Sequence, residues 1–65
     1  MQYRVQFLDD SEGVIREMHS YAWSVASVVE LLGEIDWPLA AVSLRILDPQ
    51  GREFIFGRSS VSRDR

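Results

Sequence analysis

Two similar turn signals divide the sequence, LDDSEG at residues 8–13 and LDPQG at residues 47–51, and each interrupts a segment of alternating apolar and polar residues. Short acidic residues and proline favour tight turns, and glycine readily adopts the positive φ of a type I turn with a glycine bulge. We therefore expect two β-hairpins, with Gly13 and Gly51 supplying the positive φ of their turns. Convergent turn chemistry explains this echo better than duplication of one ancestral hairpin.

Alternation with a period of two predicts four strands, over residues 2–8, 14–21, 41–47 and 52–57. The pairs expected to face each other are Val5–Met18 and Leu8–Ile15 in the first hairpin, and Ile46–Phe54 and Leu44–Phe56 in the second. The second strand alternates less regularly. Two sets of its residues compete for the core side, one with Val14, Arg16 and Met18 and the other with Ile15, Glu17, His19 and Tyr21.

Between the hairpins, AWSVASVVELLGEI at residues 22–35 changes to a helical period, with its apolar residues on one broad face. This pattern predicts an amphipathic helix of about three turns that packs on the sheet. Either Ser20 or Ser24 is expected to cap its N-terminus. The helix should end before Pro38, because a residue that precedes proline avoids the helical conformation.

The order strand, strand, helix, strand, strand predicts a two-layer α+β fold of ββαββ topology, a four-stranded antiparallel sheet with one helix packed on one face. We expect the strand order 2-1-3-4, with 1-2-3-4 and a swapped dimer as alternatives. Residues 1–57 are predicted to form a single domain. The polar segment RSSVSRDR at residues 58–65 is predicted to be a disordered C-terminal tail.

Composition argues against several classes of protein. The chain has 65 residues, a formal net charge of −3 and no cysteine. The negative charge disfavours broad attraction to nucleic acid or anionic lipid, and the lack of cysteine removes disulfides and thiolate metal sites. No segment approaches the roughly 18 apolar residues of a membrane span, and no signal peptide is evident. We therefore expect a cytoplasmic protein without a membrane partner.

No residues form a recognisable catalytic, cofactor or metal motif. His19 lacks a second histidine or a cysteine to complete a metal site, so an ordinary strand position is the better interpretation. The acidic residues Asp9, Asp10 and Glu12 lack the ligand spacing of a calcium loop and are more typical of a turn. One helix on a small sheet also offers no deep cleft. We expect no enzyme activity, cofactor, metal or small-molecule ligand.

Two surfaces are candidates for contact with another macromolecule. The sheet face away from the helix should carry four aliphatic residues, which mark an interface if contiguous or merely support the strands if scattered. On the helix, Trp23 falls at the polar edge, either exposed as an interface anchor or packed against the second hairpin or the 36–38 loop. The predicted interface residues are Leu8, Ile15, Leu47, Ile55, Trp23 and Leu31.

The run from MQYRVQFLDD through VIREMHS to the helix and LDPQGREF resembles the short, uncharacterised bacterial ββαββ proteins of unknown function known from structural genomics. This resemblance covers almost the whole chain. It rests on architecture and turn residues, so it implies the fold and assigns no site.

The leading hypothesis is a small interaction protein that binds another protein or a second copy of itself, because small domains are commonly stabilised by association. The alternative is weak binding of RNA or single-stranded nucleic acid through arginines of the sheet and tail, at positions 4, 16, 45, 58, 63 and 65. The strand aromatics Tyr3, Phe7, Phe54 and Phe56 are expected on the core side, which leaves no platform for stacking bases on the outer face. Nucleic acid is therefore the less favoured partner.

Overall fold

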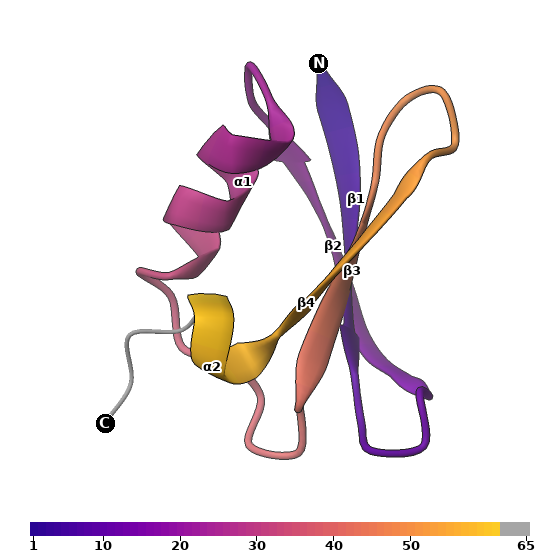
Figure 1. Ribbon diagram of the computed structural model, residues 1–65, viewed down its shortest axis with the longest axis vertical. Coiled ribbons are helices and arrows are strands. Elements are labelled where there is room, and N and C mark those ends of the chain that lie inside the picture. The colour runs from indigo at the N-terminus through magenta and orange to yellow at the C-terminus, as the bar shows by residue number, and fades with distance from the viewer. Residues whose placement is uncertain (62–65) are drawn as a thin grey trace.

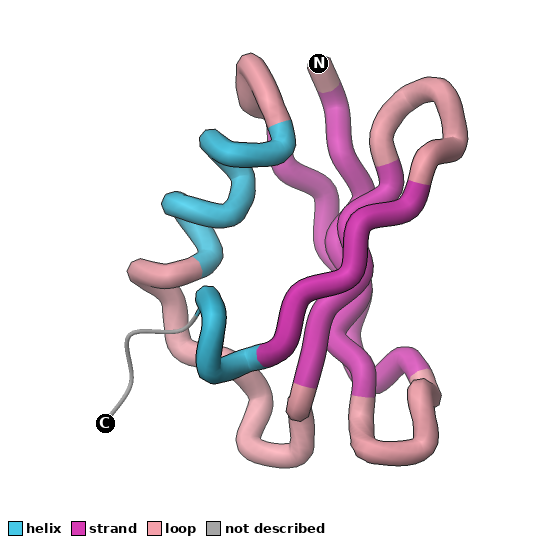
Figure 2. Tube along the Cα trace, viewed as in Figure 1, coloured by secondary structure: helices cyan, strands magenta, loops and turns pink. Residues whose placement is uncertain are grey.

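The computed structural model describes residues 1–61 and has the predicted ββαββ fold with one short additional helix (Figure 1). The elements are β1 (Gln2–Leu8), β2 (Val14–Tyr21), α1 (Val25–Leu32), β3 (Ser43–Leu47), β4 (Glu53–Gly57) and α2 (Arg58–Val61). The strands form one antiparallel sheet in the order β2-β1-β3-β4, which confirms the predicted order. Both helices lie on the same side of this sheet, and the two hairpin turns lie at its opposite ends (Figure 2).

The core fills the space between the sheet and α1. Its completely buried side chains come from the central strands β1 and β3 and from α1; they are Val5, Phe7, Val28, Leu44 and Ile46. Tyr3 and Phe7 of β1 are buried in this cluster, and Phe54 and Phe56 of β4 pack against it while half-buried, which confirms the prediction for these four aromatics. Tyr21, at the end of β2, is exposed. Neither helix of residues 1–61 has the length and apolar character needed to cross a membrane.

Trp37, in the loop after α1, closes one end of the core. Its ring packs edge-on against Phe7 with the ring centroids 5.1 Å apart. Its indole Nε1–H donates to the carbonyl of Leu32 at 2.9 Å, so the buried polar atom is satisfied. This single side chain therefore ties the end of α1 to the centre of the sheet.

Helix α1 is shorter than predicted, because the residues before Ser24 complete β2 and carry the chain to the helical layer. Ser24 is the N-cap; its hydroxyl oxygen accepts a hydrogen bond from the Ser27 amide at 3.3 Å. Gly33 ends the helix and donates its amide to the carbonyls of Val29 and Glu30. The predicted helical position of Trp23 is therefore wrong, since Trp23 precedes the cap.

The first hairpin differs from its predicted register at the turn. Val5 faces Met18 as predicted, but Leu8 faces Val14 instead of Ile15. The predicted Leu8–Ile15 pair requires a loop over residues 10–13. The amide of Asp9 instead donates to the Gly13 carbonyl, which closes a loop over residues 10–12, and a β-bulge then restores the predicted pairing from Phe7 onward.

Three further observations concern the second strand, the first turn and the second hairpin. Within the irregular second strand, Met18 packs on the core and Arg16 pairs with Phe7, so these two residues lie on the helix side, whereas Val14 lies beyond the bulge, opposite Leu8. The positive φ of the first turn belongs to Glu12, at 64°, and the assignment to Gly13 is wrong. Both predicted pairs of the second hairpin are confirmed, Ile46–Phe54 and Leu44–Phe56.

Residues 58–61 are ordered, contrary to the prediction of a disordered tail that begins at residue 58. They form α2, in which Val61 is buried in the core cluster. The guanidinium of Arg58 lies 5.6 Å from the ring centroid of Trp37 and donates to the carbonyls of Pro38 and Ala41 at 2.9 and 3.0 Å. The rest of the predicted tail, residues 62–65, lies outside the described residues.

Candidate functional site

The sheet face opposite the helices carries a polar network at its centre. The carboxylate of Glu17 lies 2.9 Å from Nε of Arg4 and accepts a hydrogen bond from the Gln6 amide at 3.3 Å. Nε of Arg45 in turn donates to Oε1 of Gln6 at 2.9 Å. The network crosses β2, β1 and β3, and it already engages two of the arginines that nucleic-acid binding would use.

This network separates the aliphatic residues predicted to form an interface on the same face. Gln6 and Arg45 lie on their strands between the Leu8–Ser43 pair and the Arg4–Leu47 pair. Leu8 is only 3% exposed and is therefore not available to a partner, and Leu47 is half-buried. Ile15 and Ile55 are exposed on the two edge strands. The four residues therefore do not form one continuous patch.

The other two predicted residues, Trp23 and Leu31, lie in one open groove of about 580 Å³. The groove lies between the end of β2 and the outer side of α1; its lining, called here the Trp23 groove, consists of Tyr21, Ala22, Trp23, Ser27, Glu30, Leu31 and Glu34. Trp23 is 91% exposed and Tyr21 82%, and Leu31 is exposed beside them. A smaller hollow lined by Met1, Tyr21, Ala22 and Trp23 shares three of these residues and extends the groove.

Helical spacing explains why α1 contributes to this groove as well as to the core. Ser27 and Leu31 are four residues apart, which places them on one side of α1, and Glu34 lies in the turn that follows the helix. Val28 and Leu32 on another side are buried. The core therefore uses only one side of α1, and Leu31 has no core partner to cover it.

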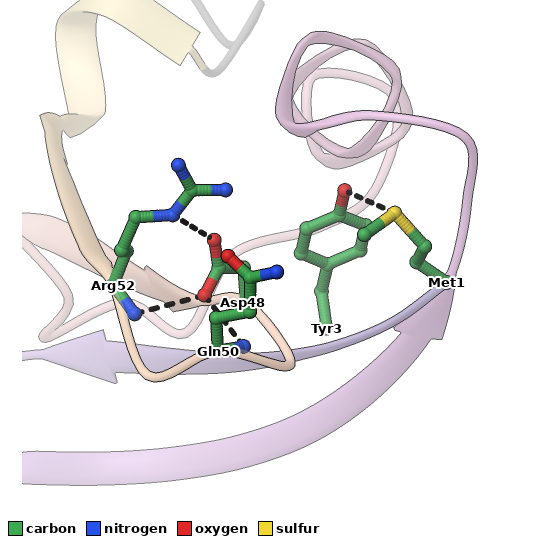
Figure 3. Close-up of polar contacts among 5 residues, drawn as sticks. All are labelled: Met1, Tyr3, Asp48, Gln50 and Arg52. Atoms are coloured by element: carbon green, nitrogen blue, oxygen red, sulfur yellow. Dashed lines mark hydrogen bonds and ion pairs between the residues drawn. The ribbon is translucent and has the colours of Figure 1, made fainter.

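The backbone that carries Trp23 is fixed on both sides. Ala22 donates its amide to the carbonyl of Met1 and accepts a hydrogen bond from the Met1 nitrogen, both at 2.9 Å. On the other side, Ser24 is held by its capping hydrogen bond with Ser27. Met1 is positioned in turn by the Tyr3 hydroxyl, which donates to its sulfur at 3.7 Å (Figure 3). Trp23 is thus a large exposed side chain on a constrained backbone.

The lining contributed by residues 1–61 contains two carboxylates, Glu30 and Glu34, beside the Tyr21 phenol, and none of these described lining residues is an arginine or a histidine. The surface therefore combines aromatic and aliphatic contact area with carboxylates. Its apolar area is complementary to apolar side chains, and its carboxylates are complementary to basic side chains.

Comparison with known proteins gives no significant match. No family model matches the chain, no curated protein matches it, and no solved structure matches it. A function therefore has to be inferred from the chemistry of the surface.

A second hollow, beside the β3–β4 turn, contains a carboxylate with a structural role. Oδ1 of Asp48 accepts hydrogen bonds from the amides of Gln50 and Arg52 at 2.9 and 2.8 Å, and Oδ2 lies 2.6 Å from Nε of Arg52 (Figure 3). Burial raises the pKa of Asp48, but the hydrogen bonds and the Arg52 charge outweigh it, so the pKa is lowered overall. This carboxylate holds the turn, and its oxygens are already engaged.

The described part of the chain contains no group of three or more histidine or acidic side chains that could hold a metal ion. His19 lies on the outer sheet face with its Nε2 3.9 Å from Oε2 of Glu17.

Two residues of the Trp23 groove, Tyr21 and Glu30, were not predicted from the sequence. The available signal was the pair of aromatics that flanks Ala22 directly before the cap serine.

Proposed function

We propose that this protein is a protein-interaction module that binds, in the Trp23 groove, an extended or helical segment of a partner that carries apolar and basic side chains. The observation that carries the proposal is Trp23 itself, 91% exposed on a backbone fixed by hydrogen bonds. Folding gains almost nothing from a tryptophan in this position. Tryptophan is, however, one of the residue types enriched among the anchors of interfaces.

The size of the exposed surface fits a peptide segment. A tryptophan or tyrosine side chain buries about 200 Å² in an interface, so at their exposures Tyr21 and Trp23 offer about 350 Å² between them. Contiguous apolar patches of about 300–600 Å² on small proteins are often functional. A stable interface between two globular surfaces needs about 800 Å² from each partner. The groove therefore suits a short segment better than a second folded domain.

Electrostatics supports a basic partner. Glu30 lines the groove, and the whole chain has a formal net charge of −3. Exposed aromatics also stack on nucleic-acid bases, but carboxylates beside them repel phosphate groups. Two of the sheet arginines are engaged by Glu17 and Gln6. The charge of the groove therefore favours a protein segment over RNA.

The proposal concerns binding alone, and the absence of enzyme activity stays a prediction. A cytoplasmic location is also part of the proposal, because a chain without cysteine gains no disulfide from an oxidising compartment. Cell fractionation with an antibody to the native protein tests the location directly.

Selection of random 12-residue peptides displayed on phage tests the groove. We expect enrichment of sequences with an aromatic or aliphatic residue beside lysine or arginine, with a Kd on the order of 10 μM. Trp23→Ser should weaken their binding at least tenfold, as expected for loss of an interface anchor. Glu30→Lys, made in the wild-type chain, should also weaken binding, most strongly for the most basic peptides, because it replaces a carboxylate with a like charge. Leu39→Ser is the matched control, because Leu39 is equally exposed and lies outside the groove.

Amide chemical shifts locate the bound peptide, and they should change for residues 21–34. Failure to enrich basic and apolar sequences would contradict the proposal, as would peptides whose binding Trp23→Ser leaves unchanged. A single-stranded RNA oligomer that binds with strong salt dependence, and that Trp23→Ser releases, would replace the protein partner with nucleic acid.

A further inference from the structure

The sheet has two open edges, β2 and β4, because the strand order is β2-β1-β3-β4. An edge strand presents unpaired backbone N–H and C=O groups that can pair with another strand. Strand β4 reads EFIFG and contains one charged residue, Glu53. Strand β2 carries Arg16, Glu17 and His19 in its middle, and charged residues of this kind commonly protect an edge from pairing. Strand β4 is therefore the less protected edge.

Hydrogen bonds at the two ends of the β3–β4 ladder establish which backbone groups of β4 are unpaired. The amide of Asp48 donates to the carbonyl of Arg52 at 3.1 Å, and the amide of Arg58 donates to the carbonyl of Val42 at 2.9 Å. Hydrogen-bonded and non-hydrogen-bonded pairs alternate along an antiparallel ladder. Positions 54 and 56 therefore bond to β3, whereas positions 53, 55 and 57 direct their N–H and C=O groups to the open edge.

We propose that two copies of this chain associate through β4, in antiparallel pairing about a two-fold axis at Ile55. In this register Ile55 faces Ile55 of the second copy, and Glu53 faces Gly57 in both directions. In each of these pairs both residues direct their N–H and C=O groups toward the other strand, so each pair forms the two hydrogen bonds of a hydrogen-bonded pair. The contact is self-complementary, as a closed two-fold interface must be, and it joins two sheets into one.

The side chains of β4 fit the same register. Ile55, which is 62% exposed, meets its own copy on the outer face. On the helix side, Phe54 of each copy faces Phe56 of the other, in the pair type where side chains lie closest. Both rings are only half-buried in one chain and become covered. Glu53 faces a glycine, so no like charges meet.

Within residues 1–61, the neighbouring elements leave this edge open. Helix α2 follows β4 directly but turns onto the side of the sheet where it contacts α1 (Figure 1), and Gly57 stays exposed. The Trp23 groove includes Tyr21 of β2, at the opposite edge of the sheet. Self-association through β4 and binding in the groove are therefore independent, and each can fail without the other.

Charge-pair variants at Ile55 test the dimer by sedimentation equilibrium up to millimolar concentration. The wild-type chain should dimerise, and Ile55→Glu and Ile55→Lys should each weaken association at least tenfold because like charges face each other on the axis. A mixture of the two variants should restore a heterodimer. Circular dichroism should show both variants folded, since Ile55 is exposed. Leu39→Glu, an exposed control away from β4, and Trp23→Ser should leave the dimer unchanged.

Hydrogen exchange gives a residue-level signature. The amides of Glu53, Ile55 and Gly57 should become at least tenfold more protected as concentration rises, and should exchange rapidly in Ile55→Glu. The amides of Phe54 and Phe56 should be protected in both. A wild-type chain that stays monomeric, a dimer that persists in Ile55→Glu, or new protection confined to β2 would each overturn the proposal.

Discussion

Truncation of the two tryptophans, one at a time, separates a structural role from a binding role within one chain. Trp37 is buried against Phe7 and bonded to the Leu32 carbonyl, whereas Trp23 is almost completely exposed. The two residues have the same side chain and lie in the same chain, so intrinsic differences between residue types cancel. Only their surroundings differ, and the surroundings predict opposite results.

The expected magnitudes follow from those contacts. Replacing a buried tryptophan with alanine costs about 3–5 kcal/mol of unfolding free energy. A domain of this length has about 3–10 kcal/mol in total, so Trp37→Ala should abolish most or all of the folded population. Trp37→Phe keeps a ring beside Phe7 but loses the hydrogen bond to Leu32, and should cost about 1–2 kcal/mol. Trp23→Ala should change stability by no more than about 0.5 kcal/mol.

Urea denaturation followed by far-ultraviolet circular dichroism measures these differences. Trp37→Phe should lower the midpoint by roughly 1 M, given a slope of about 1–2 kcal/mol per molar urea for a small domain. The midpoint of Trp23→Ala should coincide with that of the wild type. If Trp23→Ala instead costs more than about 1.5 kcal/mol, Trp23 is part of the fold and its exposure no longer indicates a binding role.

Four further substitutions test the turns and the helix cap. Glu12→Gly should stabilise the fold by about 1 kcal/mol because it removes a non-glycine residue from positive φ, and Gly51→Ala, at φ 88°, should destabilise it by about as much, both seen in thermal melts. The lowered pKa of Asp48 means that its carboxylate stabilises the fold above the ordinary value of 3.8 and that this contribution is lost as pH falls through the lowered pKa. As the pH is lowered below 3.8, the urea midpoint should therefore decrease less steeply with pH in Asp48→Asn than in the wild type. Ser24→Ala should cost about 1 kcal/mol through loss of the cap, and an unchanged midpoint would show that the long 3.3 Å hydrogen bond contributes little.

The fold was predictable because periodicity and pairing agree along most of the chain. The change from a period of two to a helical period and back located all the major elements, and the proline-containing turn fixed the second hairpin register. The first register was wrong at Leu8 because a bulge carries no simple sequence signature. Helix α2 was missed because one valine in a polar segment gave no periodic signal, although Val61 reaches the core.

The site was predictable only in part. Trp23 and Leu31 were recognised as candidates from their positions off the apolar face of the predicted helix, and the structure brings them into one groove. Tyr21 was assigned to a strand whose core side was ambiguous, so its exposure could not be read from alternation. The chain must also cross from β2 to the helical layer, and this crossing places Trp23 before the cap, where it lies beside Tyr21.

The two turns do share one structure, but their equivalent positions are counted from the aspartate at the start of each turn and not from the glycine. Oδ1 of Asp9 accepts hydrogen bonds from the amides two and four residues later, at 2.9 and 2.8 Å, and Oδ1 of Asp48 does the same at 2.9 and 2.8 Å. The positive φ falls three residues after each aspartate, on Glu12 in one turn and on Gly51 in the other. Gly13 has a different task, since a Cβ there would lie 3.1 Å from Oδ2 of Asp9. Aligning the turns by their glycines therefore misplaces the first turn and the partner of Leu8 by one residue, because the side chain that organises each turn stands at its start, while the pairing from Phe7 to Gln2 is unaffected.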